Sequence, residues 1–176
     1  MNTSIKKRGT VKAGLLSATA AFIFLFSSFN AIKAPVNFSG EWKLNESKSE
    51  LGQFPQFAPR KLKISATDTA ATVERLSVGQ DGQERSSTET LSYSGKETES
   101  TVFGTMKKKS TVKWADDGKS MTVNGVIHFE RDGQLSEIKV KEDWKLSDDG
   151  KTLTIASASS SSFGENAMKM IFDKAQ

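Results

Sequence analysis

The stretch "FSGEWKLNESKSEL", Phe38 to Leu51, has the pattern of a β-strand that runs into a loop. A Gly-X-Trp step, Gly40 to Trp42, enters a run in which apolar and polar residues alternate, and the run then gives way to a polar, loop-like string. Alternation with a period of two is typical of a strand with one buried face. The stretch therefore predicts a strand, and the sequence around it decides whether that strand opens a barrel.

After this stretch the chain is predicted to be β throughout. Asp-Gly occurs four times between alternating runs, at 81–82, 117–118, 132–133 and 149–150. Asp-Gly is a strong signal for a two-residue hairpin of type I′, whose central residues both need positive φ. We expect an all-β fold, an antiparallel up-and-down β-barrel of about nine or ten strands, because closure removes the exposed edges of an open sheet.

Three of the hairpins agree on one register. In a two-residue hairpin, residues equidistant from the turn face each other. This rule pairs Trp114 with Met121, Met121 with Trp144, and Trp144 with Ile155, so that one apolar row crosses four strands. A slip of one residue would turn the whole face outward. The agreement therefore supports the register.

The same register places charged residues on the inward face. Glu142 shares a side with Trp144, and pairing around Asp81–Gly82 sets Leu76 opposite Ser87, with Arg85 on the same side. A buried unpaired charge is costly. Two interpretations stay open: a hydrated cavity with charged groups directed at a ligand, or a bulge that turns these residues out. The candidate ligand-binding residues are Arg85, Glu89, Tyr93, Lys108, Ser110 and Glu142.

Glu142 is the sharpest of these predictions. Its carboxylate is expected inside the barrel, within reach of a basic inward group, either Arg85 or Lys108. It is interpreted either as a ligand contact or as one half of a structural ion pair.

One long connection, "NESKSELGQFPQFAPR", follows the first strand. Asn45 is predicted to cap a short helix over Glu46–Leu51. Phe54 and Phe57 lie beside prolines further along. These two rings are expected either to cover the open end of the barrel as a lid or rim, or to plug its bottom.

The N-terminus predicts a signal peptide over residues 1–34, cleaved near residues 31–34. A basic region precedes an apolar run at 13–26, and small and polar residues follow. The run is shorter than the ~20 apolar residues that a spanning helix needs. We therefore expect a mature domain over residues 35–176, with no membrane span, in the periplasm or secreted.

Removal of this leader changes the charge of the chain. The whole chain has 25 basic and 21 acidic residues, and the leader holds five of the basic ones and no acidic one, which leaves 20 against 21. A net charge of −1 provides no field for nucleic acid. His128 is predicted to point outward, and the sequence holds no nucleophile elbow, metal cluster or dinucleotide motif. We expect no enzyme activity, no metal and no cofactor.

The segment "FSGEWKLN" followed by a meander resembles the calycin group, the lipocalins and fatty-acid-binding proteins. It is also similar to small exported bacterial lipocalin-like proteins that begin FSGxWKLNxxKS. The resemblance implies a barrel that binds a small hydrophobic or amphipathic molecule in its interior. The alternative is a filled barrel that binds an envelope protein through its rim loops. The family also implies a basic residue packed on Trp42, here Lys174 or Lys169. The chain differs from secreted lipocalins in having no cysteines and no evident C-terminal helix.

Overall fold

The computed structural model describes Met1 and residues 35–79, 81–131 and 133–175. The signal peptide and cleavage region predicted within residues 2–34 lie outside the described residues. The described residues form ten antiparallel strands: β1 (Gly40–Leu44), β2 (Lys61–Ala66), β3 (Ala70–Val78), β4 (Glu84–Ser92), β5 (Thr98–Val102), β6 (Met106–Trp114), β7 (Ser120–Arg131), β8 (Gln134–Leu146), β9 (Thr152–Ser161) and β10 (Gly164–Lys174).

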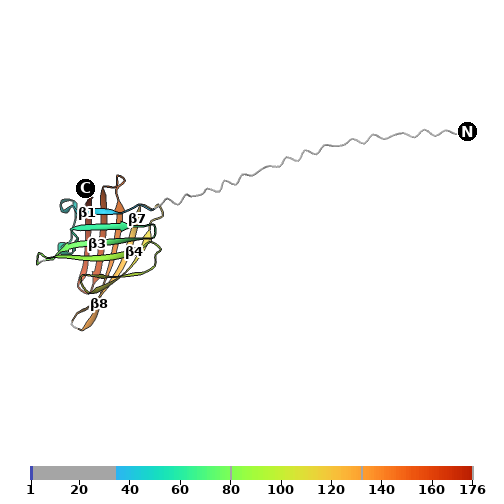
Figure 1. Cartoon of the computed structure of the whole chain (residues 1–176). Coiled ribbons are helices and arrows are strands. Elements are labelled where there is room, and N and C mark those ends of the chain that lie inside the picture. Colours follow the sequence, from blue (N-terminus) through green and yellow to red (C-terminus); the bar gives the residue numbers. More distant parts are fainter. Residues whose placement is uncertain (2–34, 80, 132, 176) are drawn as a thin grey trace. The chain divides into compact units, whose positions relative to one another are not determined.

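The strands make one sheet in the order β4-β3-β2-β1-β10-β9-β8-β7-β6-β5. Figure 1 shows β1, β3 and β4 crossing the long strands of the C-terminal half at a steep angle. Side-chain hydrogen bonds join the two edge strands, β4 and β5. The Thr98 hydroxyl donates to the Thr90 carbonyl at 2.6 Å, and the Ser100 hydroxyl accepts from the Thr90 N–H at 3.2 Å. The sheet is a nearly closed barrel, which confirms the predicted fold class.

The C-terminal hairpins have the predicted register. Trp114 pairs with Met121, Met121 with Trp144, and Trp144 with Ile155. Met121, Trp144 and Ile155 are buried, and His128 on the opposite face is exposed. The apolar row therefore lies inside the barrel.

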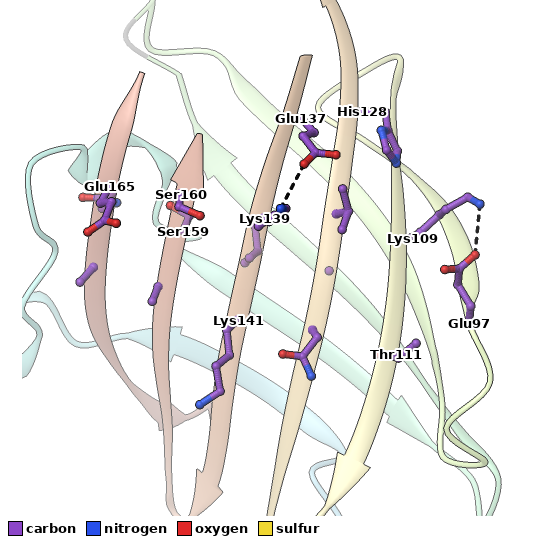
Figure 2. A pocket seen from close by; sticks show the side chains of 17 residues that line it. Glu97, Lys109, Thr111, His128, Glu137, Lys139, Lys141, Ser159, Ser160 and Glu165 are labelled. Carbon is purple, nitrogen blue, oxygen red and sulfur yellow. Dashed lines mark ion pairs between the residues drawn. The ribbon is translucent and has the colours of Figure 1, made fainter. Parts of the chain in front are cut away.

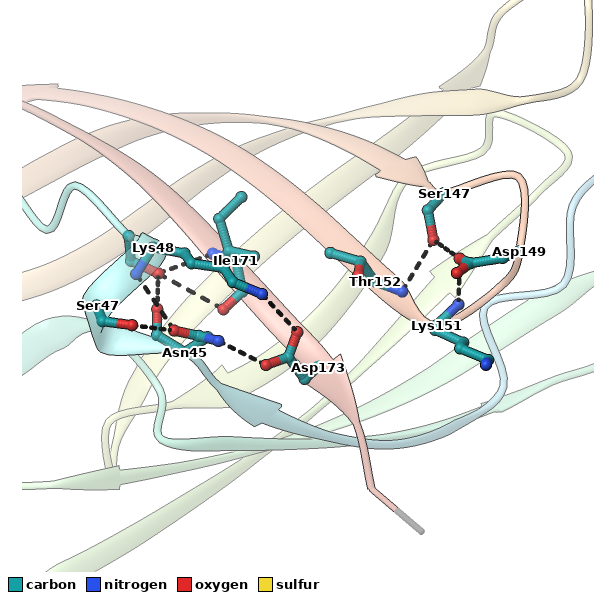
Figure 3. Close-up of polar contacts among 10 residues, drawn as sticks. Asn45, Ser47, Lys48, Ser147, Asp149, Lys151, Thr152, Ile171 and Asp173 are labelled. Carbon is teal, nitrogen blue, oxygen red and sulfur yellow. Dashed lines mark hydrogen bonds and ion pairs between the residues drawn. The ribbon is translucent and has the colours of Figure 1, made fainter.

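The turn type behind this register is not the predicted one at Asp117–Gly118 and Asp149–Gly150. Gly118 and Gly150 have positive φ, at 65° and 69°, but the aspartates before them do not. Each aspartate instead accepts a hydrogen bond from the backbone N–H two residues on, as Asp149 does from Lys151 at 3.0 Å (Figure 3). These loops have four residues, and an even number of loop residues preserves the pairing.

The β3–β4 hairpin differs from the prediction by one residue. Arg75, not Leu76, lies opposite Ser87, and Ser77 lies opposite Arg85. The cause is a three-residue loop between Gly79 and Gln83, which are joined by a hydrogen bond from the Gly79 N–H to the Gln83 carbonyl at 2.9 Å. An odd loop shifts the register, so Arg75 replaces Leu76 on the inward face.

Aromatic rings fill one end of the barrel, which we call the closed end. Phe38 stacks on Trp114 with ring centroids 5.8 Å apart and meets Trp144 edge-on at 5.9 Å. The chain enters here, where the Val36 N–H donates to the Gly118 carbonyl, and it also leaves here, where Ala175 bonds Glu41. The opposite, open end carries the β1–β2 connection and the turns β3–β4, β5–β6, β7–β8 and β9–β10.

The Gly-X-Trp step has a structural reason at the closed end. The ammonium of Lys174 lies 5.3 Å from the centre of the Trp42 ring, a cation–π contact. Gly40 has φ of 142°, and a Cβ there would lie 2.9 Å from Lys174 Cε. Gly40 therefore makes room for the lysine, and Lys174 rather than Lys169 is the basic residue on Trp42.

The β1–β2 connection holds two short 3-10 helices, η1 (Glu46–Lys48) and η2 (Pro55–Phe57). Asn45 caps η1 as predicted, because its side chain accepts from the Lys48 N–H at 3.2 Å. The Asn45 amide also donates to Asp173 at 2.6 Å, which fastens the connection to β10 (Figure 3). The helix is shorter than the predicted Glu46–Leu51. No helix of the described residues is long and apolar enough to cross a membrane.

Candidate ligand-binding site

Four charged side chains meet inside the barrel. An Arg75 Nη lies 2.8 Å from the Glu142 carboxylate and 3.6 Å from that of Glu89. The Lys108 ammonium lies 2.8 Å from Glu89. Glu89, Lys108 and Glu142 are 2%, 5% and 6% exposed. We call these four residues the internal ion network; its two positive and two negative charges balance.

Hydrogen bonds complete the network. The Trp144 Nε1–H donates to Glu142 at 3.0 Å, and the Ser110 hydroxyl donates to Glu89 at 2.5 Å. The guanidinium of Arg75 also lies 5.5 Å from the centre of the Trp144 ring. Every charge of the network therefore has a partner, as buried charges require.

The charges of the network perturb each other's protonation. Burial by itself would raise the pKa of Glu142, but the charges of Arg75 and Lys108 and the hydrogen bonds from Trp144 and Arg75 outweigh it and lower this pKa to about 2. Burial would lower the pKa of Arg75, but the charges of Glu142 and Glu89 raise it. Glu142 is thus an anion, and Arg75 a cation, across the whole neutral range.

A glycine makes room for the lysine of the network. Gly125 of β7 is paired with Ser110 of β6, and a Cβ at Gly125 would lie 2.6 Å from Lys108 Cε. The lysine side chain therefore passes over the bare backbone of β7 on its way to Glu89.

We expect Gly125→Ala to destabilise the protein by about 1–3 kcal/mol, because the new methyl group forces Lys108 away from Glu89. Urea unfolding measures the change. Gly79→Ala is the matched control: the atoms that its methyl group meets belong to Arg85 and Asp81, which are exposed and free to swing out. Equal losses in the two variants would show that displacing Lys108 is not the cause.

The structure brings together four of the six predicted site residues: Glu89, Lys108, Ser110 and Glu142. The bulge interpretation is therefore wrong for them, and Glu142 lies inside the barrel as predicted. Of its two predicted partners, Arg85 is wrong, and Lys108 lies in the same network but pairs with Glu89; Arg75 makes the direct contact with Glu142. The sequence does not predict Arg75 as a site residue, because the expected β3–β4 pairing differs from the observed one by one residue. The apolar residues at 71 and 73 offered a signal, since they put residue 75 on the inward face.

Arg85 and Tyr93 do not join the network. Arg85 lies exposed at the open end and pairs with Asp81 at 2.8 Å, beside the β3–β4 loop. Tyr93 is half-buried at the closed end, edge-on to Trp114 with ring centroids 5.1 Å apart. Burial raises the pKa of its hydroxyl. As a candidate ligand contact, Arg85 belongs to the rim, whereas Tyr93 belongs to the packed closed end.

A pocket of about 410 Å³ opens between the β1–β2 connection and the turns β3–β4 and β5–β6. We call it the mouth pocket; it is lined by Gln56, Phe57, Ser77, Gly79, Asp81, Arg85, Ser86, Ser87 and Phe103. The Phe57 ring meets Phe103 at 6.4 Å and Phe54 at 6.1 Å. These three rings are 41–54% exposed, so Phe54 and Phe57 form a rim and do not plug the barrel.

Phe103 has an unusual backbone. Its φ is 48°, a conformation that a bulky residue adopts only at a cost of about 1–2 kcal/mol. Gly104 follows it with φ of 89°. A glycine would fit the position of Phe103 more easily, so the aromatic ring at this tip carries a backbone cost.

A second hollow, of about 870 Å³, lies on the outer wall of the sheet (Figure 2). Its charged side chains are largely paired, Lys109 with Glu97 at 3.1 Å and Lys139 with Glu137 at 3.4 Å. His128 lies here, on the outer face. Among the described residues, no group of three or more His, Asp or Glu side chains is placed to bind a metal ion.

The comparisons with known proteins show a likeness in fold alone. No family model and no curated protein matches the sequence. Among solved structures, the zebrafish ileal bile acid-binding protein complexed with cholic acid is similar, with a TM-score of 0.50 and 16% sequence identity over 78% of this chain and 98% of that chain. The likeness shows that this chain has the barrel fold of the fatty-acid-binding-protein type.

Proposed function

We propose that the barrel binds a small, partly apolar molecule through the mouth pocket. The observation that carries the proposal is the pocket itself. Its volume of about 410 Å³ lies within the ~300–1,000 Å³ of small-molecule sites, and it combines aromatic walls with a few polar groups, as such sites do. The likeness to a barrel complexed with cholic acid supports a ligand of this class.

The lining sets the chemistry of the ligand. Phe57 and Phe103 offer apolar surface, and the hydroxyls of Ser77 and Ser87, on the adjacent strands β3 and β4, offer hydrogen bonds. Arg85 adds charged donors at the rim. Such a lining suits an amphipathic molecule, whose apolar part lies against the rings and whose polar groups meet the hydroxyls.

We also propose that the protein is located in the periplasm or is secreted, because the sequence predicts a signal peptide. The second candidate function is an envelope partner protein bound at the rim. It is favoured by large apolar side chains that stay exposed at the open end outside the mouth pocket: Phe54, Leu135 and Phe163.

We expect Phe57→Ser combined with Phe103→Ser to weaken binding of the amphipathic dye anilinonaphthalene sulfonate about tenfold or more, because both apolar walls are removed. Stability should change little, since both rings are about half exposed. Fluorescence titration of the purified protein measures the affinity, and thermal melting checks the fold.

Phe163→Ser is the matched control, an exposed phenylalanine at the same end that does not line the pocket. It should bind the dye like the wild type. Unchanged dye binding in the Phe57 and Phe103 double variant would contradict the mouth site. Loss of a co-purifying envelope protein in Phe163→Ser, with dye binding intact, would favour the second candidate, because Phe163 belongs to the exposed surface outside the pocket.

A further inference from the structure

The internal ion network lies directly below the mouth pocket. Ser77 lines the pocket, and Arg75 is the next inward residue of β3, opposite Ser87 of β4. On the facing wall Glu142 of β8 is paired with Ser157 of β9. The network therefore spans the barrel from wall to wall at one level.

The open half of the barrel is short. Beside the pocket, the wall runs along β3 from Arg75 through Ser77 to Gly79 just after the strand, and Ser77 and Gly79 line the mouth pocket. Four residues of strand correspond to about 13 Å. A ligand that enters at the mouth thus has about this length before it meets charged groups.

An apolar chain gains no binding free energy by extending past the internal ion network. To pass this level it would have to separate Arg75 from Glu142 or Lys108 from Glu89, and it offers no group to replace either partner. Beyond the network the closed end is already filled by Phe38, whose ring packs on Trp144. The network is therefore the floor of the site.

We infer, given the proposed function, that the internal ion network limits the site to short amphipathic molecules and excludes long acyl chains. Arg75 and Glu142 are then specificity-determining residues, because they set the depth at which an apolar chain must stop. The volume of the mouth pocket, about 410 Å³, agrees with this limit, since it lies near the lower end of the ~300–1,000 Å³ range of ligand sites.

The test is a chain-length series. Straight-chain fatty acids from hexanoate to palmitate are titrated into the purified protein below their micelle thresholds, and affinity is measured by displacement of the dye. Affinity should rise about fourfold per added methylene at first, and level off near decanoate. In Arg75→Met combined with Glu142→Gln the rise should continue for about two more methylenes, to dodecanoate, with at least a tenfold gain over the wild type, before the chain reaches the filled closed end.

This variant keeps the shape of the site. Methionine is flexible and uncharged, so it gives way to a chain, and the glutamine oxygen still accepts from the Trp144 N–H. The matched control is Lys141→Met combined with Asp143→Asn, which removes a 2.8 Å pair from the outer face of the same strand. The control should keep the wild-type limit.

The outcomes separate the two proposals. Wild-type affinity that climbs steadily to palmitate overturns the floor and leaves the proposed function standing. The same limit in wild type and network variant also overturns it, because another feature would then set the depth. Should the variant fail to fold, the wild-type series alone decides whether a limit exists. A series in which no chain binds overturns the proposed function and the floor with it.

Discussion

Arg75→Met alone should destabilise the protein by about 3–5 kcal/mol, the usual cost of removing one partner of a buried ion pair. The change leaves Glu142 without the guanidinium that lies 2.8 Å from it. It also takes away the weaker of the two positive charges beside Glu89, at 3.6 Å. Urea unfolding at neutral pH measures the loss. It should be the largest effect of any single substitution that keeps the size of the side chain.

Adding Glu142→Gln to Arg75→Met should restore most of that stability, because position 142 is then uncharged and Glu89 keeps its pair with Lys108. The control is Arg85→Met, which breaks an exposed pair with Asp81 and should cost less than about 0.5 kcal/mol. A cost below about 1 kcal/mol for Arg75→Met would contradict the cost expected for breaking a buried ion pair.

Acid should weaken the wild type by about 3 kcal/mol more than it weakens Glu142→Gln. The charges of Arg75 and Lys108 and the hydrogen bonds outweigh the effect of burial, so the pKa of Glu142 falls from the ordinary 4.5 to about 2. A lowered pKa stabilises the fold fully above pH 4.5, and this stabilisation is lost as the pH falls toward 2. The gap of about 2.5 units corresponds to about 3 kcal/mol.

Urea unfolding of both proteins at a series of pH values between 7 and 2 measures this difference. The free energy of unfolding of Glu142→Gln should fall less over the acid range, since the amide does not titrate there. Parallel curves for the two proteins would mean that the carboxylate has the same pKa folded and unfolded.

The register of the C-terminal hairpins could be predicted from the sequence although the turn type was wrong. Any loop with an even number of residues gives the same pairing of the two strands. Four-residue loops at Asp117 and Asp149 give the same pairing as the predicted two-residue turns. The β3–β4 loop has three residues between Gly79 and Gln83, and the Asp-Gly dipeptide inside it does not reveal that a third residue makes the loop odd. The predicted register there was wrong for this reason.

The site was predictable only in part, for a related reason. Strand alternation showed that Glu89, Lys108 and Glu142 face inward, because that depends on each strand alone. The partner of Glu142 lies 67 residues away on a strand that is not its neighbour in the sheet. Contacts across the interior depend on how the barrel closes, and no local pattern encodes that.

Both described ends of the barrel lie at the closed end, where Val36 bonds Gly118 and Ala175 bonds Glu41. A tether attached through either end would therefore hold the molecule by its base and leave the mouth facing the surrounding solution. The same geometry suits immobilisation on a sensor surface. A barrel attached through its C-terminus would still expose Phe57, Phe103 and the pocket between them to a ligand in solution.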